Sequence, residues 1–114
     1  MTVLELKDAL GLTELTQGGE LDRTVEGAYC GDLLSWVMGR AQDGDAWVTI
    51  MTNINVVAVA SLADTACVVL AENVHVQEDV VQTAAAKGVT LVRSAEPTFT
   101  VCKRIGVLLD GEGV

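Results

Sequence analysis

Proline, basic residues and histidine are all scarce in this chain. Proline occurs once among 114 residues while half of the residues are apolar, so the sequence is not that of a disordered low-complexity chain and can bury a core. Seven basic residues stand against sixteen acidic ones, which gives a formal net charge of −9. That charge repels phosphate backbones and anionic membrane surfaces, so we expect neither a nucleic acid nor a membrane as a partner.

Several catalytic motifs are absent as well. The sequence contains no GxxxxGK[ST], no GxGxxG and no GxSxG segment. Its single histidine, His75, falls in a polar loop, where a solvated side chain is the simplest interpretation. The three cysteines, Cys30, Cys67 and Cys102, are odd in number and widely spaced, and the acidic N-terminus shows no signal-peptide pattern. We expect free thiols in a reducing, cytoplasmic protein that holds no metal and no cofactor.

One apolar stretch is long enough to resemble a membrane span. Residues 46–63 carry no charge, which is about the minimum length for a spanning helix. Polar residues interrupt the stretch, among them Asn53 and Asn55, and these would be costly in the middle of a bilayer. A buried strand, a polar turn and a buried helix explain the stretch better.

Hydrophobic periodicity predicts strands and helices in alternation. We expect helices over 2–10, 32–41, 53–64, 77–88 and 96–109, strands over 24–30, 46–51, 66–71 and 89–94, and a weak strand or extended arm over 12–19. The expected helix starts are a Thr2–Glu5 capping box, Asp32 and Asn53 as N-caps, and Pro97 in a first turn. The apolar residues expected to point inward are Leu33, Leu34, Val37, Met38 and Ala41 in the second helix and Phe99, Cys102, Ile105 and Leu109 in the last.

This pattern predicts an α/β fold. The strands are apolar on both faces, which favours a single-domain, mostly parallel sheet of about four to five strands covered by helices. No linker or internal repeat divides the chain. We expect one domain over residues 1–109 and a flexible C-terminal tail over residues 110–114.

The segment around Arg23 is the first candidate binding region. Arg23 is one of few cations and stands beside Asp22, which fits an ion pair, a subunit contact or an anion clamp. Gly31 and Asp32 form a strand-to-helix turn, and such turns lie at the carboxyl edge of a parallel sheet, where ligands usually bind. An N-cap at Asp32 would, however, occupy the free amides of that helix start and repel an anion.

Asn53 and Asn55 form the second candidate region. They follow the strand predicted over 46–51, again at a carboxyl end. Asn53 is expected to cap the next helix, whereas the Asn55 amide either holds a buried loop or binds a ligand's polar edge. If the two strands are neighbours, Asn55 and the turn over 27–32 share one crevice, with Arg23 beside it.

Three segments resemble the DRTGG domain family, and the resemblance extends over nearly the whole chain. They are LDRTVEGAYCGDLLSWVM, GDAWVTI and NVVAVA, in that order. Asp22, Arg23 and Thr24 stand as in the family name, whereas Val25 and Glu26 replace the glycine pair and leave only Gly27. The resemblance implies an α/β module similar to domains that accompany CBS modules in pyrophosphatases, that occur within phosphotransacetylases, and that form the non-kinase N-terminal domain of HPr kinase/phosphorylase. It implies a regulatory, often dimerising role.

Three functions follow as hypotheses. The first is a non-catalytic regulatory or interaction module, acting as a homodimer, with Trp36 and residues 56–63 as candidate contact surfaces. The second is a sensor of a nucleotide or phosphorylated metabolite. Its candidate ligand-binding residues are Asp22, Arg23, Thr24, Gly27, Asp32, Asn53 and Asn55. The third is an enzyme with Asp22 or Asp32 as general base and Arg23 as electrostatic stabiliser.

Overall fold

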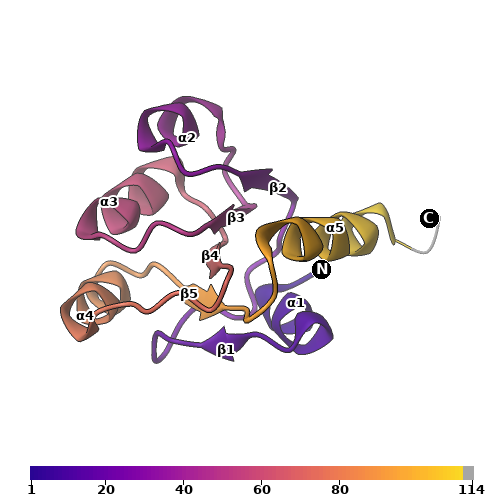
Figure 1. Cartoon of the computed structure of the whole chain (residues 1–114), viewed down its shortest axis with the longest axis horizontal. Coiled ribbons are helices and arrows are strands. Elements are labelled where there is room, and N and C mark those ends of the chain that lie inside the picture. Colours follow the sequence, from indigo (N-terminus) through magenta and orange to yellow (C-terminus); the bar gives the residue numbers. More distant parts are fainter. Residues whose placement is uncertain (112–114) are drawn as a thin grey trace.

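The computed structural model describes residues 1–111 and confirms an α/β fold (Figure 1). The described residues form five helices and five strands. In chain order these are α1 (Val3–Leu10), β1 (Thr13–Glu14), β2 (Gly27–Cys30), α2 (Leu34–Arg40), β3 (Asp45–Thr49), α3 (Ile54–Ala63), β4 (Cys67–Leu70), α4 (Glu78–Ala86), β5 (Leu91–Arg93) and α5 (Thr98–Asp110).

The strands form one sheet in the order β1-β5-β4-β3-β2. β2, β3, β4 and β5 are parallel to their neighbours, whereas β1 pairs antiparallel with β5. The two edges of the sheet are therefore β1 and β2. The mostly parallel sheet predicted from the sequence is confirmed, and the weak arm over 12–19 supplies its antiparallel edge strand.

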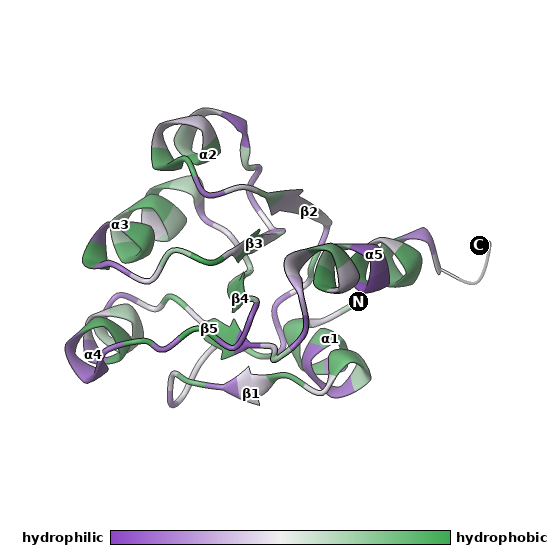
Figure 2. Cartoon of the chain, viewed as in Figure 1, coloured by the Kyte–Doolittle hydropathy of each residue, from purple (hydrophilic) through white to green (hydrophobic). Residues whose placement is uncertain are grey.

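Helices cover both faces of the sheet. α2, α3 and α4 lie on one side and α1 and α5 on the other (Figure 1). The core divides accordingly: Trp47 packs in the cluster with α2, α3 and α4, while its neighbour Val48 packs in the cluster with α1 and α5. Successive strand residues point to opposite faces, so a strand buried on both sides must be apolar throughout. β4, with the sequence CVVL, shows this along its whole length (Figure 2).

The caps predicted at Thr2 and Asn53 are present. Thr2 and Glu5 form the capping box, with the Thr2 amide donating to Glu5 Oε1 at 2.8 Å and the Glu5 amide to Thr2 Oγ1 at 3.1 Å. Gly11 ends α1 with a left-handed φ of 64°, which glycine adopts without the steric cost of a Cβ. Asn53 caps α3, as expected, by accepting from the Asn55 amide at 2.9 Å.

Other details of the sequence interpretation are wrong. α2 begins two residues late, with Leu33 rather than Asp32 at the N-cap and no side-chain cap. Of the five residues in and around α2 that were expected to point inward, only Val37 is fully buried. Leu33 and Met38 are exposed, and the other two are partly buried. In the last helix Phe99 is 78 % exposed, and Pro97 is the N-cap residue rather than part of the first turn.

The predicted C-terminal tail over residues 110–114 stays a prediction. α5 continues through Asp110, so the expected domain end at 109 falls inside a helix. Residues 112–114 of the expected tail lie outside the described residues. The uncharged stretch over 46–63 forms β3, a turn and α3, as predicted. Among the described residues, none of the helices combines the length and the apolar character that crossing a membrane requires.

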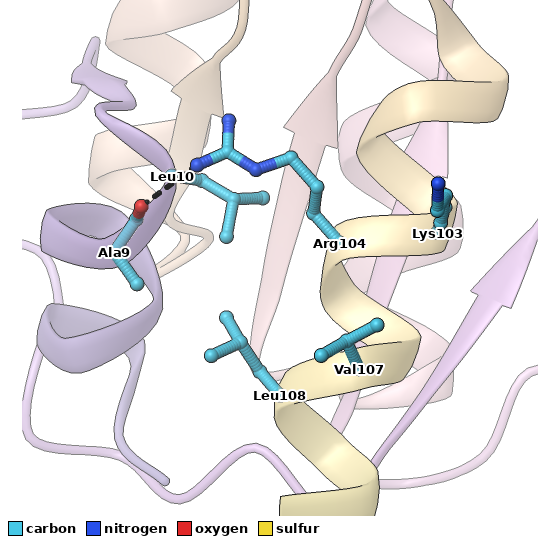
Figure 3. A pocket seen from close by; sticks show the side chains of 6 residues that line it. All are labelled: Ala9, Leu10, Lys103, Arg104, Val107 and Leu108. Atoms are coloured by element: carbon cyan, nitrogen blue, oxygen red, sulfur yellow. Dashed lines mark hydrogen bonds between the residues drawn. The ribbon is translucent and has the colours of Figure 1, made fainter. Parts of the chain in front are cut away.

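α1 and α5 meet around a hollow of about 200 Å³ (Figure 3). Arg104 reaches across it from α5 and donates to the Ala9 carbonyl at 3.0 Å, at the end of α1 where carbonyls lack helical partners. The same side chain donates to Glu96 Oε1 at 2.6 Å. The hollow is thus a helix–helix junction closed by a fixed arginine.

Candidate interaction surface

Arg23 lies at the amino edge of the parallel strands, in a cluster with two carboxylates. Its Nη1 donates to Asp64 Oδ1 at 2.9 Å, and its Nη2 donates to the Asp64 carbonyl at 2.7 Å and to Asp43 Oδ1 at 3.1 Å. Asp43 comes just before β3, and Asp64 comes between α3 and β4. The guanidinium therefore joins three chain segments at the start of three neighbouring strands.

The ion pair between Arg23 and Asp64 shifts the pKa values of both side chains. The hydrogen bond to Asp64 raises the pKa of Arg23, and the same bond lowers the pKa of Asp64 from its ordinary value of 3.8. Asp64 also has a left-handed φ of 56°, a conformation that costs a non-glycine residue about 1 kcal/mol. Of the roles expected for Arg23, the structure shows an ion pair, but its partners are Asp43 and Asp64 rather than the adjacent Asp22.

The neighbours of Arg23 are structural as well. Thr24 forms a bridge with Thr2, which attaches the segment before β2 to the start of α1. Gly27 begins β2, and a Cβ at this position would lie 2.8 Å from Asp45 Oδ1. Asp45 is buried and accepts from the Gln42 amide at 2.7 Å, so its carboxylate has little freedom to move. Asp22 is exposed and makes no side-chain hydrogen bond within the described residues.

Asp32 lies at the opposite, carboxyl edge of the sheet. Instead of capping α2, it accepts from Thr49 Oγ1 at 2.7 Å and from the Ile50 amide at 3.0 Å. It thereby ties the end of β2 to the end of β3. The Trp47 indole supports the same connection by donating to the Gly31 carbonyl at 2.9 Å.

The carboxyl edge also exposes large apolar side chains. Leu33 and Trp36 at the start of α2, and Ile50 and Ile54 on either side of the turn before α3, are each between 41 % and 61 % exposed. Asn55 is exposed beside them, and no side-chain hydrogen bond of its own is found in residues 1–111. We call Leu33, Trp36, Ile50 and Ile54 the apolar rim.

The shared crevice predicted for Arg23 and Asn55 is wrong. Arg23 precedes the parallel strands, whereas Asp32, Asn53 and Asn55 follow them. Strands of this length rise by about 3.3 Å per residue, so the two edges lie on the order of 15 Å apart. The seven predicted ligand-binding residues therefore divide between two edges of the sheet.

β2 is an open edge strand of a different kind from β1. It spans four residues, GAYC, with no charge and no proline, and its pairing partner β3 occupies only one side. β1 is only two residues long and carries Glu14. Native proteins protect edge strands with charges, proline or short length, and β2, though only four residues long, carries neither a charge nor a proline within its span.

The face of β2 toward α5 is incompletely covered. Ala28 and Cys30 are exposed there and line a hollow of about 210 Å³ with Cys102 and Gly106 of α5. Phe99 lies one helical turn before Cys102 and is also exposed. Sequence reasoning missed this surface because it expected Phe99 inside. The signal available was the small, weakly apolar composition of β2, which does not suit a strand buried on both faces.

Comparisons with known proteins agree with this architecture. A solved structure with a similar fold is that of the CBS and DRTGG domains of the regulatory region of Clostridium perfringens pyrophosphatase, complexed with the activator diadenosine tetraphosphate. The TM-score is 0.71 at 10 % sequence identity, and the match covers 91 % of this chain but 45 % of that one. A search of curated proteins finds no match. The family model of the DRTGG domain matches residues 5–108, so the chain belongs to the DRTGG domain family.

Proposed function

We propose that this chain is a non-catalytic regulatory module that acts by pairing with a second copy of itself through β2. The observation that carries the proposal is the open edge of β2, which is uncharged, four residues long and unblocked. In a two-fold dimer the same strand meets itself antiparallel, so one edge supplies both partners. The expected product is a continuous sheet across the two copies.

The surroundings of β2 support association. The hollow at Ala28 and Cys30 lies on one face of the strand, and Trp36 of α2 is 55 % exposed beyond its carboxyl end. The Arg40 guanidinium lies 4.0 Å from the centre of the Trp36 ring, which fixes that ring at the surface. Aromatic residues and arginine are enriched at protein–protein interfaces, which fits the exposed Trp36 and Arg40 near this edge. The similar region of the pyrophosphatase belongs to a regulatory region, which supports a regulatory role here.

A catalytic role has weaker support. Arg23 is neutralised by Asp43 and Asp64, and Asp32 accepts two hydrogen bonds from β3 and the residue after it. The enzyme hypothesis rested on these two residues and on Asp22, which is exposed to solvent. A nucleotide sensor built from Arg23 and Asn55 loses its basis because the two residues lie at opposite edges of the sheet. The cytoplasmic location expected from the sequence remains part of the proposal.

The dimer is tested by sedimentation velocity over protein concentrations from about 10 µM to about 500 µM. We expect the wild-type chain to dimerise, and Ala28→Lys to remain monomeric because a charge blocks the edge. Thr13→Lys, an exposed position on the opposite edge strand, is the matched control and should dimerise normally. Each copy carries a net charge of −9, so added salt should strengthen the wild-type dimer.

A wild-type chain that stays monomeric across this range contradicts the homodimer. So does an Ala28→Lys variant that dimerises as well as wild type, since another surface must then be used. Circular dichroism and thermal unfolding of Ala28→Lys establish that any monomer is a folded one.

A further inference from the structure

A hollow of about 610 Å³ lies along the flank of α4. Its volume falls within the range of about 300–1,000 Å³ typical of small-molecule sites. The lining residues are Leu15, Gln17, His75, Val76, Glu78, Val81, Gln82, Ala85 and Arg93. They come from the segment after β1, the loop between β4 and α4, one side of α4, and the end of β5.

The helical side of this hollow is one continuous face of α4. Glu78, Val81, Gln82 and Ala85 have the spacing i, i+3, i+4 and i+7, which places their side chains in one stripe. That stripe does not face the core, where Val80 and Ala84 are buried. The hollow is therefore a groove along α4. It is polar at Glu78, where the helix begins, and Val81 and Gln82 form its middle.

Two opposite charges line the groove without neutralising each other. Arg93 is half-buried at the end of β5, and the only hydrogen bond of its side chain within residues 1–111 is a long one, 3.4 Å, to the Val74 carbonyl. Among the described residues neither Arg93 nor Glu78 forms an ion pair, so the two are more than 4 Å apart. Arg23 in the amino-edge cluster, in contrast, forms ion pairs with both Asp43 and Asp64.

We propose that this groove binds a small zwitterion of the free α-amino-acid class. The ligand's carboxylate pairs with Arg93, and its ammonium pairs with Glu78. The fork of a guanidinium matches a carboxylate in a bidentate geometry. Separated opposite charges in one groove favour a ligand that carries both signs.

The same residues disfavour a phosphorylated ligand. Glu78 and the neighbouring Asp79 stand beside the groove in a chain of net charge −9, so a multiply charged anion meets repulsion. The remaining lining suits the rest of an amino acid. Leu15 and Val81 are partly buried and form an apolar wall, while Gln17 and Gln82 offer amide donors and acceptors.

The test is a titration of the ¹⁵N-labelled full chain with the standard free amino acids, each up to about 10 mM, followed by NMR amide shifts. We expect at least one amino acid to give saturable shifts at Gln17, Gln82 and Arg93. The N-acetyl derivative of that amino acid lacks the ammonium and its amide lacks the carboxylate. Each should bind about tenfold more weakly or worse. Inorganic phosphate, the anionic probe, should give no saturable shift at these amides.

Variants separate the two charges. Glu78→Gln and Arg93→Gln should each weaken binding about tenfold or more. Asp79→Asn removes a charge from the same helical turn outside the groove and should leave binding unchanged. If Arg93→Gln fails to fold, Glu78→Gln, at an exposed position, and the two ligand derivatives still decide the question.

The proposal is overturned if no free amino acid produces saturable shifts. It is also overturned if both derivatives bind as tightly as the parent, if phosphate is the tighter ligand, or if Asp79→Asn weakens binding as much as Glu78→Gln. None of these results depends on whether the chain is a dimer.

Discussion

The Arg23 guanidinium holds Asp64 by both its side chain and its backbone, with contacts of 2.9 Å to Oδ1 and 2.7 Å to the carbonyl oxygen. Asp64 ends α3 in a left-handed conformation. The arginine therefore stabilises a strained residue at the point where α3 turns toward β4. Arg23, a residue of the family motif, therefore contributes to the stability of the fold.

Replacing Arg23 by glutamine should lower the free energy of unfolding by about 1 kcal/mol, since partly exposed ion pairs contribute little more than this. The pKa of Asp64 is lowered in the folded state, so its stabilisation is present above the ordinary value of 3.8 and is lost as pH falls through the folded value. Urea unfolding at about pH 7 and about pH 3 measures both effects. Arg23→Gln should destabilise at pH 7 and have less effect at pH 3.

Asp64→Asn is the companion variant, because asparagine tolerates the left-handed region but carries no charge. It should behave like Arg23→Gln at neutral pH. Equal destabilisation by Arg23→Gln at both pH values would show that the ion pair is not the source.

Replacing Gly27 and Gly39 by alanine should change the stability of the fold in opposite directions. Gly27→Ala places a Cβ 2.8 Å from Asp45 Oδ1, beside a buried and hydrogen-bonded carboxylate, and should destabilise the fold by about 1–3 kcal/mol. Gly39→Ala adds a Cβ within α2 that meets nothing within 4 Å, and should stabilise by about 0.5–1 kcal/mol through helix propensity. Chemical denaturation of both variants beside wild type measures the difference. If Gly27→Ala left the stability unchanged, the segment that carries Asp45 would have to move aside at little cost in free energy.

The cysteines predict a loss of stability in alkali. Burial raises the pKa of the Cys67 thiol from 9.0 to about 12, and burial together with a hydrogen bond to Cys30 raises that of Cys102 to about 12. Between about pH 9 and pH 12 the unfolded chain releases protons that the folded chain keeps, so stability falls as pH rises. Cys67→Ala should flatten this slope in urea unfolding experiments. An unchanged slope would remove Cys67 as its cause.

The order and type of the elements could be predicted from the sequence because they depend on local spacing. Val80 and Ala84 mark one face of a helix, and the uninterrupted apolar run from Cys67 to Leu70 marks a strand buried on both sides. The capping box at Thr2 requires residues only three apart. Such signals need no knowledge of the rest of the fold.

The site could be predicted only in part because its contacts are long-range. Asp32 has the sequence of an N-cap, but Thr49 and the Ile50 amide compete for its carboxylate once β2 and β3 pair. Arg23 seemed close to the carboxyl edge because it is near Asp32 in sequence. A strand between the two residues separates them instead. The partners of Arg23, Asp43 and Asp64, lie in two loops that are distant in sequence, and no local sequence pattern identifies them.

The pairing of β1 with β5 and the packing of α1 on α5 join the two ends of the chain. Val3 and Leu6 share one buried cluster with Val101 and Ile105 of α5, so this cluster is complete only when segments about 100 residues apart have come together. Contacts of such long range slow folding and leave the nascent chain open to aggregation.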